Sequence, residues 1–223
     1  MTLTLTDREA RRGWIYLFLY LLVIPNGITM LGSLFSIRSA ATLNLMAFFL
    51  NAVLAAVFFR ELLGRSWENN RWGRTLWTAA KGFALYWLLS GLVLTLIRVL
   101  KPDYFNINDT GVNALIDEAP VLMPLAVVFA APLAEECLFR GWLFTGLARK
   151  SLPLAYAVTA VFFSAIHVVG YIGSYDVQTL LLCFSQYLVP SIVLCRTCQK
   201  ADSLLSPLLL HMTINTIALF TTR

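Results

Sequence analysis

Three ionisable residues, Glu135, Glu136 and Arg140, interrupt the apolar stretch APLAEECLFRGWLF. Glu136 and Arg140 are four residues apart, so on a helix they share a face and can neutralise each other. Glu135 is turned by about 100° from Glu136 on a helix of 3.6 residues per turn, which leaves it outside that pair. A carboxyl group without a charged partner in an apolar setting is suited to accept and donate protons. Glu135 is therefore the first candidate for acid–base chemistry.

The chain contains two histidines, and both lie in apolar stretches. His167 ends the sequence FFSAIH, and His211 begins the sequence HMTIN, which ends at Asn215. On a helix, His211 and Asn215 point in the same direction. One carboxylate, two imidazoles and a carboxamide suit the activation of a water molecule for attack on a carbonyl group. In this hypothesis Glu135 and His167 orient and deprotonate the water, while His211 and Asn215 donate hydrogen bonds to the oxyanion.

The same side chains also allow a metal mechanism. Glu135, His167 and His211 form a ligand set of the kind that zinc hydrolases use. The sequence has no HExxH motif, the usual helical zinc motif of metalloproteases. A metal-free mechanism based on the glutamate would need no cofactor, and the residues leave both routes open. The GxSxG motif of serine hydrolases is also absent from the sequence.

The composition indicates which elements position these residues. Hydrophobic residues make up 59% of the 223 residues and charged residues 13%, whereas about a quarter of the residues in a soluble domain are charged. We therefore expect an all-α polytopic membrane bundle, because helices satisfy their own backbone hydrogen bonds in lipid. Seven apolar runs of sufficient length predict seven membrane-spanning helices. These runs lie near residues 14–36, 42–60, 75–98, 120–148, 153–170, 177–196 and 203–221.

Depth along the predicted helices brings the candidate residues to one level. At 1.5 Å per residue, Glu135 and His167 each lie roughly 21 Å from the same side of the membrane. His211 and Asn215 lie roughly 12 and 18 Å from that side. All four fall within one layer of a hydrocarbon core about 30 Å thick. The sequence therefore predicts one site that is built from three helices.

Basic residues are distributed unevenly between the two predicted sides of the membrane. The N-terminal side carries Arg8, Arg11, Arg12, Arg60, Arg65, Arg71, Arg74, Arg149, Lys150, Arg196 and Lys200, and the other side carries Arg38, Arg98, Lys101 and Arg223. Basic loops favour the cytoplasm, so we expect the N-terminus inside and the C-terminus outside. The scattered positions of these residues also argue against binding of nucleic acid.

Three sequences, EECLFRGWL, FSAIH and HMTIN, resemble the ordered motifs EExxxR, FxxxH and HxxxN of the CAAX protease and bacteriocin-processing family, also called CPBP or Abi. The resemblance covers the C-terminal half of the chain. It implies an intramembrane endopeptidase with a helical-bundle fold that acts on a prenylated or hydrophobic peptide. It also implies that Glu136 and Arg140 hold the site together or contact the substrate, and that Phe163 packs beneath His167. The chain length suits a prokaryotic member, in which bacteriocin processing is a common role.

We interpret residues 1–223 as a single integral membrane domain. Residues 1–118 supply N-terminal spans and loops, and residues 119–223 form a four-helix core that carries the three motifs. The expected partners are membrane lipids and a prenylated or hydrophobic peptide. Two alternatives stay open: a non-catalytic immunity or binding protein with the same fold, and a proton-coupled transporter, because carboxylates and histidines within spans also mark ion paths. The pair Cys195 and Cys198 is expected to consist of ordinary reduced thiols.

Overall fold

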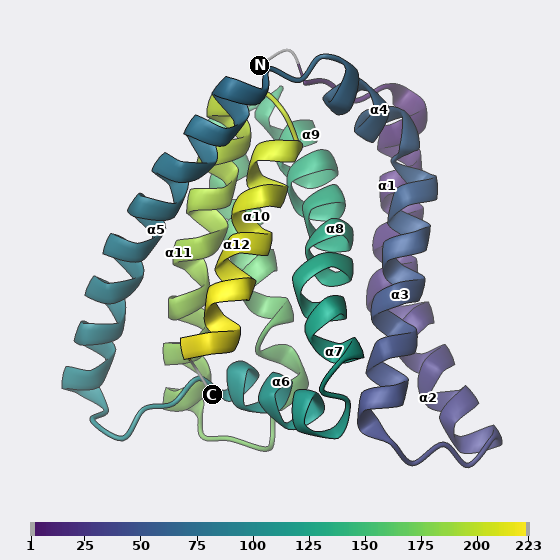
Figure 1. The fold of residues 1–223 in the computed structure, drawn as a ribbon, viewed down its shortest axis with the longest axis vertical. Coiled ribbons are helices and arrows are strands. Elements are labelled where there is room, and N and C mark those ends of the chain that lie inside the picture. Colours follow the sequence, from purple (N-terminus) through teal and green to yellow (C-terminus); the bar gives the residue numbers. More distant parts are fainter. Residues whose placement is uncertain (1–2, 222–223) are drawn as a thin grey trace.

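The computed structural model describes residues 3–221 of the chain (Figure 1). The regular elements in this range are helices, and no β-strand lies within it. Six helices in this range are long and apolar enough to cross a membrane. They span Asp7–Leu34, Ala40–Phe58, Trp72–Leu100, Leu122–Ala148, Leu152–Tyr171 and Val177–Ala201. A seventh apolar helix, Leu205–Thr221, occupies the last predicted position but has only 17 residues, roughly 26 Å of helix. The predicted all-α polytopic bundle is thus confirmed, and Arg223 lies outside the described residues.

The N-terminal part contains three of the long helices. The first is continuous and consists of α1 (Asp7–Phe18), the π-helical turn η1 (Leu19–Val23) and α2 (Ile24–Leu34). It is followed by α3 (Ala40–Phe58), α4 (Arg60–Glu68) and α5 (Trp72–Leu100). Most of α4 lies between the second and third predicted spans, 42–60 and 75–98, and its Leu62 is fully buried. This short amphipathic helix packs one apolar face on the bundle, which its many charged residues concealed.

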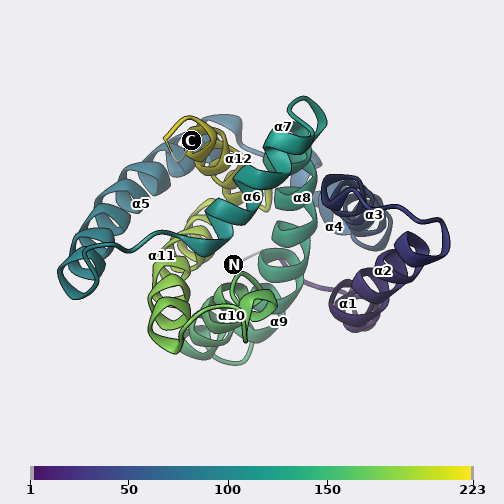
Figure 2. The ribbon, with the colours of Figure 1, turned by 90° about the horizontal axis from the view of Figure 1, so that it is seen from below.

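The C-terminal part begins with α6 (Ile107–Glu118), a short helix between the third and fourth long helices. The fourth long helix is a continuous series of α7 (Leu122–Leu125), η2 (Ala126–Ala130), α8 (Ala131–Glu135), η3 (Glu136–Phe144) and α9 (Thr145–Ala148). The remaining elements are α10 (Leu152–Ile166), η4 (Val169–Tyr171), α11 (Val177–Ala201) and α12 (Leu205–Thr221). Seen from below, α6 runs across the end of the bundle, and it contacts α3, α7 and α11 (Figure 2).

Polar side chains fix where several helices of the bundle begin. The side chain of Ser151 accepts a hydrogen bond from the N–H of Leu154 at the start of α10. Asp176 caps α11, and Asn106 caps α6 by accepting from the second and third residues that follow it. Capping of this kind satisfies N–H groups that have no partner within a helix.

The fourth long helix lies at the centre of the bundle. In the most apolar 18 residues of this helix 61% of the residues are buried, against 6% in the corresponding part of α5. The first long helix comes close to it at Gly13, where an added Cβ would clash with the Trp142 ring. The indole N–H of Trp142 donates to the carbonyl of Ala10 at 3.0 Å. A glycine is required there because any side chain would separate the two helices.

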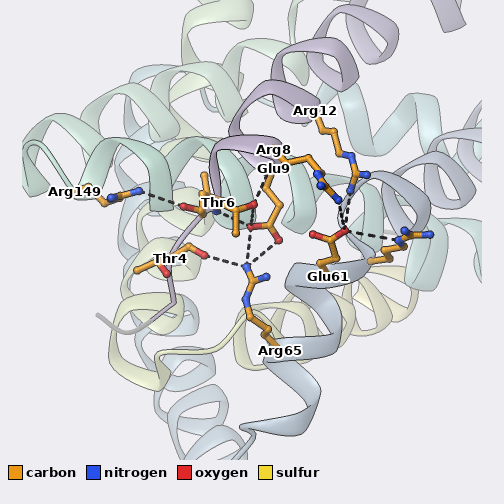
Figure 3. A network of polar contacts seen from close by, with 10 residues as sticks. Thr4, Thr6, Arg8, Glu9, Arg12, Glu61, Arg65 and Arg149 are labelled. Carbon is orange, nitrogen blue, oxygen red and sulfur yellow. Dashed lines mark hydrogen bonds and ion pairs between the residues drawn. The ribbon is translucent and has the colours of Figure 1, made fainter.

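A polar network joins the N-terminal segment to α4 and α9 at the end of the bundle opposite α6 (Figures 1 and 3). The fully buried carboxylate of Glu9 pairs with Arg65 at 2.8 Å and forms a capping box with Thr6. Glu61 lies within 4.0 Å of three arginines, and Arg149 donates to the carbonyl of Leu5. These contacts fix the first long helix relative to the helix that carries the two adjacent glutamates.

Candidate functional site

The two glutamates occupy a change of helical geometry. Glu135 is the last residue of α8, and Glu136 is the first residue of the π-helical segment η3. A second π-helical segment, η2, ends one residue before α8 begins. π-helical turns are rare and are often found at functional sites. The segment that carries the charged residues is therefore set apart by its backbone as well as by its side chains.

Arg140 is the centre of a buried polar network. Its guanidinium is fully buried and donates to Glu136 at 2.9 Å. A second guanidinium nitrogen donates to the carbonyl and hydroxyl oxygens of Ser191 on α11, each at 3.2 Å. The guanidinium also lies over the ring of Phe163, 4.4 Å from its centroid. Because a buried charge must be paired and hydrogen-bonded, Arg140 holds the fourth helix against α10 and α11.

His211 on α12 lies between the two glutamates. Its Nδ1 is 2.8 Å from Oε1 of Glu136, so Nδ1 carries the proton and donates to the carboxylate. Its Nε2 is 3.9 Å from Oε2 of Glu135. This second distance is too long for a direct hydrogen bond and suits a bridging water molecule.

Glu135 is buried, with 9% of its surface exposed. Its Oε2 atom has no hydrogen-bond partner among the described residues. Such a group is costly in an apolar interior unless water or a ligand satisfies it. The carboxylate of Glu135 is thus available to a small polar molecule. Glu136 differs in that its Oε1 is engaged by Arg140 and His211, although its Oε2 also has no hydrogen-bond partner among the described residues.

His167 is the C-cap of α10 and follows its last residue. Its Nδ1 lies 2.7 Å from the carbonyl oxygen of Phe163, one turn earlier. The carbonyl can only accept, so Nδ1 carries the proton and Nε2 stays available. The ring of Phe163 packs against both imidazoles, with centroid distances of 4.6 Å to His167 and 5.9 Å to His211. Phe163 therefore lies between the two histidines and the buried guanidinium of Arg140.

Asn215 lies one helical turn after His211, and its amide is held by the fourth helix. Its Nδ2 donates to the carbonyl of Val127 at 2.9 Å. That carbonyl lies in η2, where the N–H of Ala131 bonds to the carbonyl of Ala126. The next N–H along a π-helix would come from residue 132, which is a proline and has none. Pro132 thus explains why a backbone oxygen is left for Asn215, which keeps a second amide hydrogen for another acceptor.

The predicted metal ligands, Glu135, His167 and His211, are not gathered into a ligand set. Within residues 3–221, no group of three or more histidine, cysteine, aspartate and glutamate side chains has an arrangement that could hold a metal ion. The side chains in this arrangement do not fit a three-ligand metal site, and we derive no step through a metal.

Sequence reasoning missed two residues that contact the predicted ones. Ser191 binds Arg140, and the ring of Tyr187 stacks on His167 at 4.1 Å between centroids. Both lie on α11, which carries none of the three motifs. The polar pair Gln186 and Tyr187 within an apolar span was a signal for such a contact. Cys195 and Cys198, also on α11, are buried free thiols, as expected.

Comparisons with known proteins point in the same direction as the motifs. Residues 117–217 match the family described as type II CAAX prenyl endopeptidase Rce1-like. The UPF0177 protein YxdF of Lactococcus lactis subsp. lactis (strain IL1403) is 24% identical over 145 residues, which cover 59% of this chain and 73% of that protein. No solved structure matches the chain.

Replacement of Arg140 tests the buried network. The Arg140→Leu variant leaves the Glu136 carboxylate without its buried cation, which we expect to lower the free energy of unfolding by about 3–5 kcal/mol. Thermal unfolding of the purified protein in detergent measures the loss. Arg98→Leu, at an exposed position of α5, is the matched control. Equal melting temperatures for the two variants would show that the network contributes nothing to stability.

Proposed function

We propose that this chain, whose three motifs resemble those of the CAAX protease and bacteriocin-processing family and whose residues 117–217 match the Rce1-like family, is an intramembrane endopeptidase that uses Glu135 to activate water. The observation that carries the proposal is the buried Oε2 atom of Glu135. It has no partner among the described residues and lies 3.9 Å from Nε2 of His211. A water molecule between these atoms would satisfy both and would lie next to a base.

The charges around this position support a basic Glu135. The cluster contains two carboxylates, Glu135 and Glu136, and one guanidinium, Arg140, so one further proton makes it neutral. His211 can hold that proton because each of its ring nitrogens faces a carboxylate oxygen. With the proton on His211, Glu135 is a carboxylate that can accept a proton from water. A neutral cluster is also the least costly arrangement in a buried setting.

The proposed reaction is hydrolysis of a peptide bond. Glu135 takes a proton from the water molecule, and the hydroxide oxygen bonds to the carbonyl carbon, whose oxygen becomes negatively charged. The tetrahedral intermediate then breaks at the carbon–nitrogen bond. The leaving amine receives the proton from Glu135, which returns to its starting state. One water molecule is consumed, and no redox partner or cofactor is needed for the balance.

The remaining motif residues take supporting roles in this proposal. We assign His211 and Asn215 to the oxyanion: the Nε2–H of His211 and the second amide hydrogen of Asn215 are the available donors. His167 orients the water through Nε2, since its Nδ1 is engaged by Phe163. Glu136 and Arg140 hold His211, as their hydrogen bonds suggest.

The substrate class follows from the surroundings of the site and from the family. A site within a bundle of apolar helices is reached by peptides that enter or lie on the membrane. We therefore propose a hydrophobic or prenylated peptide, with membrane lipids as the other partner. A prokaryotic cell membrane and a role in bacteriocin processing belong to the same proposal.

The Glu135→Gln variant is the direct test of the reaction. We expect a loss of cleavage of about 10²–10⁴-fold, because the amide cannot act as the base. The assay uses a quenched hydrophobic peptide, with and without a prenylated C-terminal cysteine, and purified protein in detergent. Glu68→Gln, at an exposed carboxylate of α4, is the control and keeps full activity.

The outcomes of this test separate the three candidate functions. Cleavage that survives both Glu135→Gln and His167→Ala contradicts the assignment of the base. A wild-type protein that binds the peptide and never cuts it supports the non-catalytic alternative. A proton-coupled flux that is lost in Glu135→Gln, without any cleavage, supports a transporter.

Removal of metal ions tests whether cleavage depends on a metal. We expect protein that has been treated with chelator, and shown by elemental analysis to be free of metal, to keep its cleavage rate. This expectation follows from the dispersed arrangement of the three predicted ligands. Loss of activity that is restored by zinc would overturn the metal-free proposal.

The orientation in the membrane is proposed from the basic residues that gather at the end where the N-terminus lies. We place that end in the cytoplasm, so the end covered by α6 faces outward. Because the four native cysteines are buried, single cysteines can report the orientation. In intact cells, a membrane-impermeant maleimide is expected to label Ser174→Cys, whereas Lys150→Cys requires permeabilised cells. The reverse pattern would refute the orientation.

A further inference from the structure

His167 lies just beyond the end of its helix. It follows the last residue of α10 and precedes the 3-10 turn η4. Its side chain makes a local hydrogen bond that joins Nδ1 to the carbonyl of Phe163. That bond still allows the ring to tilt, because it constrains one atom. The orientation of Nε2 therefore depends on what packs against the ring.

The ring of Tyr187 is the group that packs most closely against His167. The two rings are stacked, with centroids 4.1 Å apart and planes 21° apart. Phe163 contacts the same imidazole at 4.6 Å with an interplanar angle of 41°. Two aromatic rings from two helices thus restrict the imidazole, and the more parallel contact comes from α11.

The hydroxyl of Tyr187 is fixed by α6. It accepts a hydrogen bond from Nδ2 of Asn108 at 2.9 Å and donates to Oδ1 of Asp109 at 3.2 Å. Both the donor and an acceptor site of the hydroxyl are used. A tyrosine held at its far end in this way cannot rotate about χ1 without breaking both bonds.

Asn108 and Asp109 are themselves fixed at the start of α6. The N-cap residue Asn106 accepts from the backbone N–H of both, at 2.9 and 3.1 Å. The amide of Asn106 and the hydroxyl of Tyr104 both donate to Gln186, the residue before Tyr187. The beginning of α6 is therefore attached to α11 at two consecutive residues.

Asp109 lies at this attachment although burial is unfavourable for its charge. Burial raises the pKa of Asp109 to about 6, against the opposing effect of the hydrogen bond from Tyr187. A desolvated carboxyl group needs contacts that offset its cost. The hydroxyl of Tyr187 supplies such a contact.

We propose that Tyr187 is a positioning residue for His167, and that α6 fixes Tyr187 through Asn108 and Asp109. The short helix across the end of the bundle is then part of the construction of the site. The inference deepens the proposed function and rests on it for the reaction, while the position of the His167 ring can be tested by itself.

The first experiment measures the ring directly. The chain has two histidines, so protein labelled with ¹³C at histidine Cε1 gives two ring signals in a detergent micelle. The face of an aromatic ring shifts nearby protons upfield. In Tyr187→Leu we expect the His167 signal to move downfield, while the His211 signal stays in place; His167→Ala assigns the two signals. An unmoved His167 signal would overturn the proposal.

The second experiment measures peptide cleavage. In Tyr187→Leu we expect kcat to fall about 10–100-fold, since small displacements of a catalytic group cost up to about 10²-fold. KM is expected to stay nearly constant, because Tyr187 acts through His167. Tyr187→Phe keeps the stacked ring and lacks the hydroxyl, so kcat should fall less than in Tyr187→Leu. Asp109→Asn keeps an acceptor for the hydroxyl, so kcat should fall less still.

Tyr156→Phe is the matched control. The hydroxyl of Tyr156 donates to Gln199 at 2.8 Å and so joins the same two helices, α10 and α11, away from His167. We expect it to keep kcat and both ring signals. An equal loss of kcat in Tyr156→Phe and Tyr187→Phe would indicate a general effect of helix packing and overturn the positioning role.

The two experiments separate the inference from the function on which it rests. If the wild-type protein cuts no peptide but the His167 signal moves in Tyr187→Leu, the proposed function fails and the structural role of Tyr187 stands. If the wild-type protein cuts peptide and Tyr187→Leu keeps both kcat and the His167 signal, the proposed function stands and this inference fails.

Discussion

The buried guanidinium of Arg140 is the constraint on which the site depends. A cation within a bundle of apolar helices needs polar partners, and Arg140 has Glu136 on its own helix and Ser191 on α11. The same oxygen of Glu136 fixes His211, and His211 in turn faces Glu135. Neutralisation of one charge therefore determines the relative positions of the fourth helix, α11 and α12. Arg140 and His211 both bind Oε1 of Glu136, so Oε2 of Glu135 and Oε2 of Glu136 are left without hydrogen-bond partners among the described residues.

The backbone of the fourth helix contributes as much as its side chains. Two π-helical segments, η2 and η3, flank the five residues of α8, at whose end Glu135 lies. Pro132 interrupts the hydrogen bonding at this point, and the Val127 carbonyl accepts from Asn215 instead. Pro132, which would weaken an ordinary helix, thus leaves free the carbonyl oxygen through which α12 bonds to the fourth helix. The amide of Asn215 is consequently oriented by backbone atoms, which are harder to displace than a side chain.

The sequence predicted the features that depend on local pattern. Long apolar runs located the helices, and the fixed spacings within EECLFR, FSAIH and HMTIN pointed to the same kind of family that residues 117–217 match. Contacts between distant elements were out of reach. The stack of Tyr187 on His167 depends on how α10 and α11 pack, and α4 forms because Leu62 is buried against other helices. The residues of these segments do not by themselves predict either feature, except that Gln186 and Tyr187 are polar residues in an apolar span.

The length of α12 bears on how water reaches the buried carboxylates. The helix has 17 residues, roughly 26 Å of helix. It is shorter than a hydrocarbon core of about 30 Å, and a bilayer adapts to a short helix by thinning around it. This helix carries His211 and Asn215. A bilayer thinned around α12 would shorten the path from the aqueous phase to these two residues and to Glu135.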